Sequence, residues 1–63
     1  MEAHQQRVVD EKTDLDGKLQ RLTLFFSGPI FSTLKQDEKD RLHRQAVSMR
    51  SYSDVLGERI SAF

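Results

Sequence analysis

The sequence predicts an all-α protein, an antiparallel two-helix hairpin that assembles as a homo-oligomeric helical bundle. Apolar residues recur at helical spacing in both halves of the chain. A Ser-Gly-Pro segment at positions 27–29 separates the halves, and such a segment can end one helix and start another. The chain is 32% charged and has only one proline and three glycines, which is typical of helical, soluble proteins. Its 63 residues fit one domain, 1–63.

The first helix is predicted over residues 4–26. Its apolar residues follow one helix face, with Lys12 in place of the apolar residue that one turn lacks. We expect the Lys12 methylenes to lie along this face while the ammonium reaches water. Gly17 weakens the helix by about 1 kcal/mol relative to alanine, and it marks either a close helix contact or a local softening. The predicted core residues of this helix are Val8, Leu15, Leu19, Leu22 and Phe26.

The corner of the hairpin is predicted over residues 27–35. Gly28 is a natural helix C-cap, and Pro29 cannot continue a helix but can begin one. The following residues are expected to form a single helical turn or a short 3₁₀ segment. Three apolar residues of this turn should close the open end of the hairpin: Ile30, Phe31 and Leu34.

The second helix is predicted over residues 36–61. Acidic residues crowd its first turns, where negative charge suits the helix dipole. Its apolar residues follow a seam that repeats every seven positions. The predicted core residues are Leu42, Ala46, Met49, Leu56 and Ile60. Opposite charges four positions apart suggest ion pairs along both helices: Asp14–Lys18, Asp37–Arg41, Asp40–Arg44 and Arg50–Asp54.

Self-association is predicted because so short a chain buries little surface alone. The chain has no cysteine to form a disulfide or a thiolate metal site. Its two histidines supply too few ligands for a typical structural zinc site. We therefore expect no metal and no cofactor, and a homo-oligomer with a dimer favoured. Several residues remain unexplained by one hairpin and form a candidate interface for oligomerisation or for a partner: Val9, Leu24, Phe25, Phe31, Gln45, Tyr52, Val55 and Arg59.

The sequence disfavours three functional motifs: a calcium loop, a helix-turn-helix and a catalytic site. Residues 14–17 resemble part of a calcium loop, but the first and last ligand positions would be a lysine and a threonine. Residues 55–61 resemble the turn of a helix-turn-helix reader, yet the chain stops at Phe63, before a recognition helix. No nucleophile, base and orienting group converge, so we expect no enzymatic activity.

Basic residues gather between positions 35 and 50 and form a candidate patch for phosphate contact. Acidic residues are interspersed with them, and Lys and Arg together equal Asp and Glu at 10 each, so the net charge is zero. A dedicated nucleic-acid binder is usually basic, which makes this the weaker interpretation. The candidate basic patch consists of Lys35, Lys39, Arg41, Arg44 and Arg50.

The pattern of the chain resembles a family of short helical-hairpin proteins from tailed phages. Its closest likeness is to the small early-region proteins of lambdoid phages, from the segment between the recombination exonuclease and the excisionase. The resemblance covers nearly the whole chain and is most specific from position 45 to position 60, at Gln45, Met49, Tyr52, Val55-Leu56 and Arg59-Ile60. It implies a small, non-enzymatic protein made early in infection that tilts the host toward lytic development through contacts with host factors.

Three functions follow as hypotheses. The first is an interaction module in the host cytoplasm that binds a host or phage protein. The second is a nucleic-acid accessory protein that uses the basic patch. The third is a sponge for a small anionic signalling nucleotide, held between protomers. No long apolar run is present, so we expect neither a signal peptide nor a membrane span.

Overall fold

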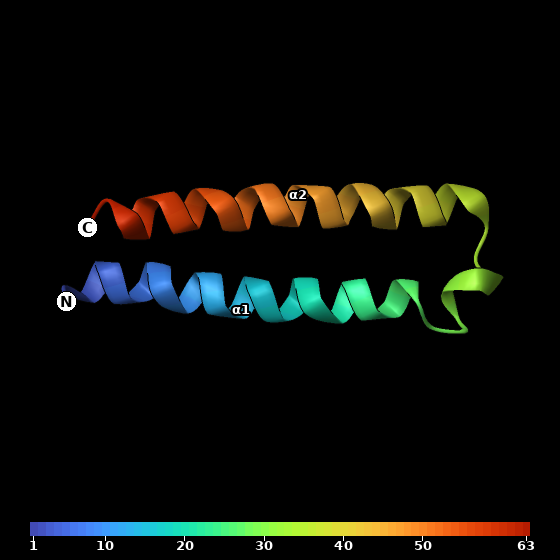
Figure 1. Cartoon of the computed structure of the whole chain (residues 1–63), viewed down its shortest axis with the longest axis horizontal. Helices are drawn as coiled ribbons and strands as arrows, with labels where there is room; N and C mark the ends of the chain where they lie inside the picture. Colours follow the sequence, from blue (N-terminus) through green and yellow to red (C-terminus); the bar gives the residue numbers. More distant parts are fainter.

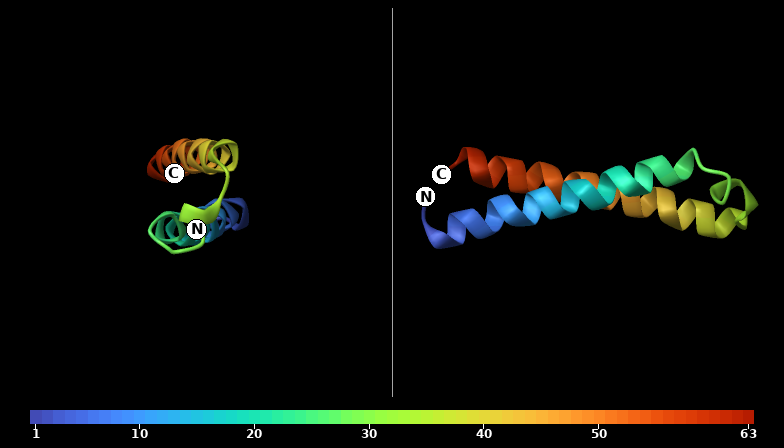
Figure 2. Two further views of the ribbon diagram at one scale, coloured as in Figure 1. Left: turned by 90° about the vertical axis from the view of Figure 1, so that its right-hand side faces the viewer. Right: turned by 90° about the horizontal axis from the view of Figure 1, so that it is seen from below.

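Two long helices lie antiparallel and side by side in the computed structural model, which describes all 63 residues. Helix α1 spans Ala3–Phe26, a 3₁₀ turn η1 spans Phe31–Thr33, and helix α2 spans Gln36–Ser61. The chain reverses at one end of the molecule, and both termini lie at the other (Figures 1 and 2). The molecule is elongated, at 46 × 16 × 13 Å. The predicted all-α hairpin is confirmed, and neither helix is long and apolar enough to cross a membrane.

The core is a thin line of apolar residues between the two helices. Val8 and Leu15 of α1 cluster with Leu56 of α2, which is fully buried, and Met49 and Ile60 pack against this cluster. Apart from Ala46, which is buried, the remaining residues of the predicted seam are only half-buried: Leu19, Leu22, Phe26 and Leu42. Because each helix has only one neighbour, most of its circumference stays in contact with water.

At the start of each helix, a side chain of the first turn accepts a hydrogen bond from a backbone N–H. At the start of α1, the Glu2 backbone N–H donates to Gln5 Oε1 at 2.9 Å. At the start of α2, Lys35 contributes no side-chain cap, and Asp37 Oδ1 instead accepts from the Glu38 backbone N–H at 3.0 Å. The acidic first turn predicted from the dipole argument therefore also supplies a hydrogen-bond acceptor.

The corner departs from the prediction at two residues. Ser27, rather than Gly28, is the C-cap of α1, and Gly28 has no positive φ. Ile30 is 61% exposed and does not help to close the hairpin. Phe31 and Leu34 are half-buried, which leaves them to cover the open end of the seam.

The two glycines inside the helices have different surroundings. A Cβ built on Gly17 would meet only Arg21 of its own helix, at 3.5 Å, so Gly17 does not mark a close helix contact. Gly57 faces the other helix, and a Cβ there would lie 3.6 Å from Lys12 Cε. Helix α2 continues past Gly57 to Ser61, so residues 55–61 form no turn.

Candidate functional site

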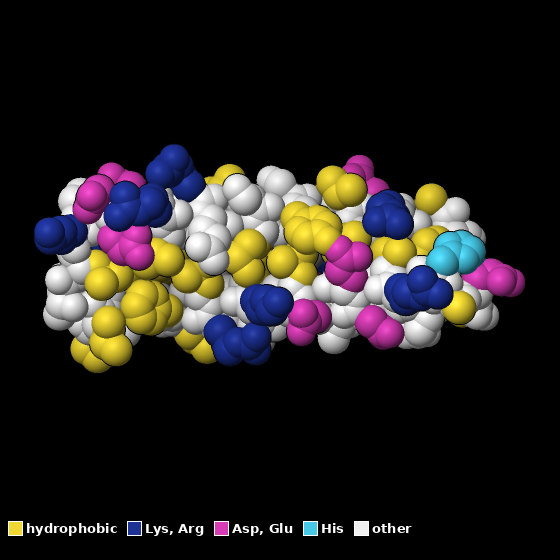
Figure 3. Space-filling model, turned by 180° about the vertical axis from the view of Figure 1, so that it is seen from behind, with side chains coloured by type: hydrophobic (Ala, Val, Ile, Leu, Met, Phe, Trp, Pro, Cys, Tyr) yellow, Lys and Arg dark blue, Asp and Glu magenta, His cyan; other side chains and the backbone are white.

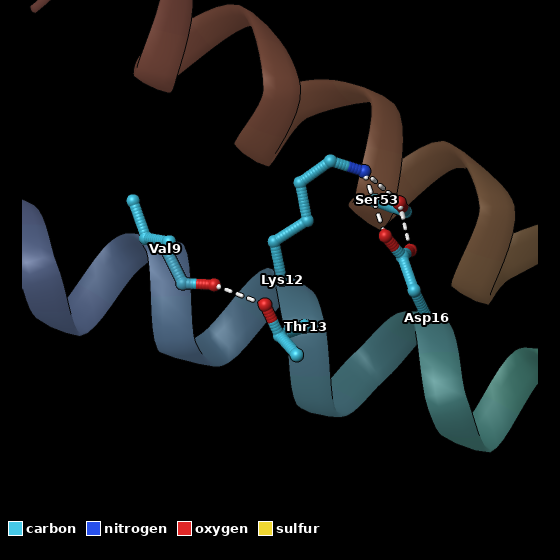
Figure 4. A network of polar contacts seen from close by, with 5 residues as sticks. All are labelled: Val9, Lys12, Thr13, Asp16 and Ser53. Atoms are coloured by element: carbon cyan, nitrogen blue, oxygen red, sulfur yellow. Dashed lines mark hydrogen bonds and ion pairs between the residues drawn. The ribbon is translucent and has the colours of Figure 1, made fainter.

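A cluster of three polar side chains crosses the seam near the middle of the hairpin (Figure 4). Lys12 Nζ donates to Asp16 Oδ2 at 3.0 Å on its own helix and to Ser53 Oγ at 2.7 Å on α2. The Ser53 hydroxyl donates in turn to Asp16 Oδ1. Each of the three side chains contacts the other two, so this Lys12–Asp16–Ser53 cluster joins the helices through direct polar bonds.

The cluster is structural rather than reactive. Ser53 is only 6% exposed, and its hydroxyl is engaged as both donor and acceptor, so it cannot meet a substrate without separating the helices. The Ser53 hydroxyl, followed by the Lys12 ammonium, holds the pKa of Asp16 below its ordinary value of 3.8. The carboxylate therefore stays ionised and keeps accepting both bonds at neutral pH.

This cluster corrects the expectation for Lys12. Its stem follows the seam as predicted, but the ammonium is held by Asp16 and Ser53 and does not simply extend into water. The sequence carried a partial signal, because Asp16 lies four residues after Lys12, which is a favourable spacing for a helical pair. The role of Ser53 could be recognised only once the register of α1 against α2 was known.

Aromatic side chains form a second cluster at the corner. The His43 ring stacks on Phe26, with centroids 4.5 Å apart, and meets Phe31 edge-on at 5.5 Å. Phe31 also packs edge-on against Phe26 at 5.2 Å and Phe25 at 6.2 Å. Lys39 Nζ lies 5.6 Å from the Phe31 ring centroid. Phe31 therefore joins the corner to both helices, and His43, although exposed, stacks on this aromatic cluster.

The candidate basic patch is not a uniform cationic surface. Arg41 is paired with Glu38 at 2.8 Å and with Asp37 at 3.7 Å, and the Glu38 hydrogen bond raises the pKa of Arg41. Lys39 packs over an aromatic ring. Four members of the patch have no ion-pair partner, namely Lys35, Lys39, Arg44 and Arg50.

Two of the four expected ion pairs form. Lys18 pairs with Asp14 at 3.3 Å, and Arg41 pairs with Asp37. The expected Asp40–Arg44 and Arg50–Asp54 pairs do not form, and Asp40 instead accepts from the Gln36 side-chain amide at 2.9 Å. Arg44 and Arg50 are thus exposed cations whose guanidinium groups are available to an anion.

The residues of the candidate interface lie on several sides of the hairpin. Val9, Phe25 and Phe31 are half-buried, whereas Leu24, Gln45, Tyr52, Val55 and Arg59 are exposed. Gln45, Tyr52 and Arg59 recur every seven residues and share one side of α2. Leu24 lies nine residues from Leu15, about two and a half turns, so it points away from the seam. These residues do not form one continuous surface.

The surface of the single chain carries a line of apolar side chains along its length but has no pocket. Figure 3 shows hydrophobic side chains following the middle of one broad face, with charged side chains of both signs around them. No pocket is present in which the chain alone could enclose a small molecule.

Comparison with known proteins places the chain in a family. A family model described as Sequestin matches residues 2–62. The chain belongs to the Sequestin family. It is also 36% identical over 63 residues to a protein of Enterobacteria phage T4 named "Uncharacterized 7.5 kDa protein in denB-rIIB intergenic region", with 100% of this chain and 98% of that protein covered. No solved structure matches the chain.

The family assignment supports one part of the sequence-based resemblance. A small protein of phage origin is confirmed by the Sequestin match and by the T4 relative. The narrower likeness to lambdoid early-region proteins is not supported by either match and stays a prediction. Both matches span nearly the whole hairpin, so the likeness concerns the complete two-helix unit rather than one helix.

Proposed function

We propose that this member of the Sequestin family is a non-enzymatic phage accessory protein that sequesters a small anionic signalling nucleotide of the host. The observation that carries the proposal is the match of residues 2–62 to the family model described as Sequestin, a description that we interpret as sequestration. A sequestering protein needs affinity and copy number but no chemistry. The protein acts in the host cytoplasm, where such signals are made.

The surface chemistry of the hairpin suits an anionic ligand with a planar base. Exposed arginines without an ion-pair partner, among them Arg44, Arg50 and Arg59, can donate paired hydrogen bonds to phosphate oxygens. Tyr52 is exposed seven residues before Arg59, so an aromatic ring and a guanidinium share one side of α2. Since the single chain has no pocket, the ligand would be held between copies of the protein.

The direct test is calorimetric titration of the purified protein with a panel of cyclic mono- and dinucleotides. The proposal predicts saturable binding of at least one member. After heat denaturation of the complex, chromatography should recover that nucleotide unchanged. Recovery of a cleaved or modified product would contradict the non-enzymatic role, and failure of every nucleotide to bind would contradict the ligand class.

A matched pair of variants tests the arginine contribution. Arg59→Gln should weaken nucleotide binding roughly tenfold or more, because a charge-assisted hydrogen bond to phosphate is lost. Lys18→Gln should leave binding unchanged, because the Lys18 ammonium is already paired with Asp14 at 3.3 Å. Equal effects of the two substitutions would indicate nonspecific attraction of the anion to positive charge.

A second candidate function is favoured by the exposed apolar residues outside the seam. Leu24, Ile30 and Val47 are each more than 60% exposed, and such side chains can anchor a host or phage protein that favours lytic development. A Leu24→Glu variant that keeps nucleotide affinity but loses a host protein captured by the wild-type chain would support this role. Nucleic-acid binding is the weaker alternative, since acidic residues are interspersed with the basic patch and the net charge of the chain is zero.

A further inference from the structure

The chain contains two methionines, and only one of them belongs to the core. Met49 of α2 is half-buried and packs against the cluster of buried apolar side chains between the helices. Met1 precedes α1 and is 79% exposed. The chain has no cysteine and no tryptophan, so these two thioether sulfurs are its most easily oxidised groups. A mild oxidant therefore has one target in the core and one outside it.

The Met49 sulfur lies at the surface edge of the seam. Its Sδ atom accepts a hydrogen bond from Gln45 Nε2, one turn earlier in α2, at 3.8 Å. The Gln45 side chain is exposed, so the sulfur that it contacts is close to water, although Met49 also packs against the core cluster. A small oxidant can reach such an atom while the two helices stay together.

The contact with Gln45 also suits the oxidised form of Met49. A thioether sulfur is a weak hydrogen-bond acceptor, whereas a sulfoxide carries a polar oxygen that accepts strongly. The Gln45 amide already donates to the sulfur, so it can donate to the new oxygen from the same position. This bond draws the oxidised side chain toward the exposed side of α2 and away from the core cluster.

The core is small enough for one altered side chain to change the stability of the hairpin. Only four apolar residues of the chain are buried. Met49 and Ile60 are the two partly buried side chains that pack against the main cluster. Each helix has only one neighbouring helix, so no further layer of side chains can replace a lost contact. A polar sulfoxide in place of the Met49 sulfur therefore weakens the packing between α1 and α2.

We infer that Met49 is a modification site at which a hydroperoxide loosens the hairpin. The Sδ lone pair attacks one oxygen of hydrogen peroxide, and the O–O bond breaks. The proton of the attached hydroxyl moves to the departing oxygen, which leaves as water, so the sulfur loses two electrons and the peroxide gains two. A methionine sulfoxide reductase reverses the change. Met49 thus acts as a redox-sensitive switch on stability, and this switch does not depend on the nucleotide proposed above.

Treatment of the purified chain with dilute hydrogen peroxide tests the assignment. Peptide mass spectrometry should find one added oxygen on Met1 and one on Met49. The midpoint of thermal unfolding should fall by about 5 °C or more, and enzymatic reduction of the sulfoxides should restore it. Full oxidation of Met49 with an unchanged midpoint would overturn the proposal. So would a folded chain in which Met1 is fully oxidised and Met49 stays unmodified.

Two variants separate the core sulfur from oxidation in general. Met49→Leu keeps an apolar side chain of similar volume, so it should fold and keep its midpoint after peroxide treatment. The double variant Met49→Leu with Val47→Met moves the sulfur to a position that is 61% exposed on the outer side of α2. It should gain as much oxygen as the wild type with little change in midpoint. A fall equal to that of the wild type in either variant would place the damage elsewhere and refute the role of Met49.

Discussion

At the scale of single residues, the Lys12–Asp16–Ser53 cluster supplies the only side-chain hydrogen bonds between the two helices. Few apolar residues are buried, so a direct polar bond between the helices has unusual weight in this small protein. Ser53 is the central member, since its hydroxyl accepts from Lys12 and donates to Asp16. Its buried position also means that removal of the hydroxyl leaves two charged groups with fewer partners.

Ser53→Ala should lower the free energy of unfolding by about 1–2 kcal/mol, because two hydrogen bonds to charged groups are lost at a buried site. Urea denaturation followed by circular dichroism measures the change. Ser51→Ala is the matched control, since Ser51 is exposed on the same helix and makes no side-chain hydrogen bond. Equal stability of the two variants would show that the Ser53 bonds contribute nothing net.

The lowered pKa of Asp16 predicts a stability that depends on pH. Its folded-state pKa lies below the ordinary value of 3.8, so the contribution of Asp16 is fully present above that value. The contribution is then lost as the pH falls through the lower folded-state pKa. Thermal unfolding between pH 2 and pH 6 should show wild type and Asp16→Asn converging in stability as the pH falls below about 4.

Asp14→Asn is the control for this titration, because Asp14 also pairs with a lysine four residues away but is exposed. Its stability should run nearly parallel to that of the wild type across the same range. A wild-type curve that stays parallel to that of Asp16→Asn down to the lowest pH would contradict the role of Asp16.

At the scale of the elements, both helices could be predicted from the sequence, but the conformation of the corner could not. Apolar spacing determined both helices, the corner and the seam residues, because each depends on local periodicity. The Gly28 cap was wrong, since Ser27 ends α1 with ordinary helical backbone angles and no left-handed residue is needed. Ile30 was misjudged because the path of the corner, and not its composition, decides which side chains close the end of the hairpin.

Gly17→Ala should stabilise the hairpin by about 1 kcal/mol, because α1 gains helix propensity and the new methyl meets only Arg21 at 3.5 Å. A rise in the midpoint of thermal unfolding measures the effect. Gly28→Ala should be nearly neutral, because Gly28 has no positive φ. A destabilised Gly17→Ala variant would imply a second helix against that side of α1.

Met49→Asp should unfold the protein, because it places an unpaired charge against the Val8–Leu15–Leu56 cluster. Loss of the helical signal in circular dichroism reports this outcome. Val47→Asp, on the exposed side of the same helix, should keep the signal. Retention of full helicity by Met49→Asp would show that the seam is assigned to the wrong face of α2.

At the scale of the whole molecule, the hairpin is thin and elongated, at 46 × 16 × 13 Å. It buries only five of its 63 residues and offers no pocket. Self-association remains a prediction from the short length and the lack of cysteine, which do not indicate the face that a second copy would cover.

The central claim, that this Sequestin-family protein withholds a small nucleotide without altering it, is tested most directly by native mass spectrometry. The tagged protein would be purified from phage-infected host cells under gentle conditions. The account predicts a species of two or more chains that carries an anionic nucleotide, and the same nucleotide released intact on denaturation. Chains that carry no small molecule while the host signal is abundant in the same lysate would contradict it.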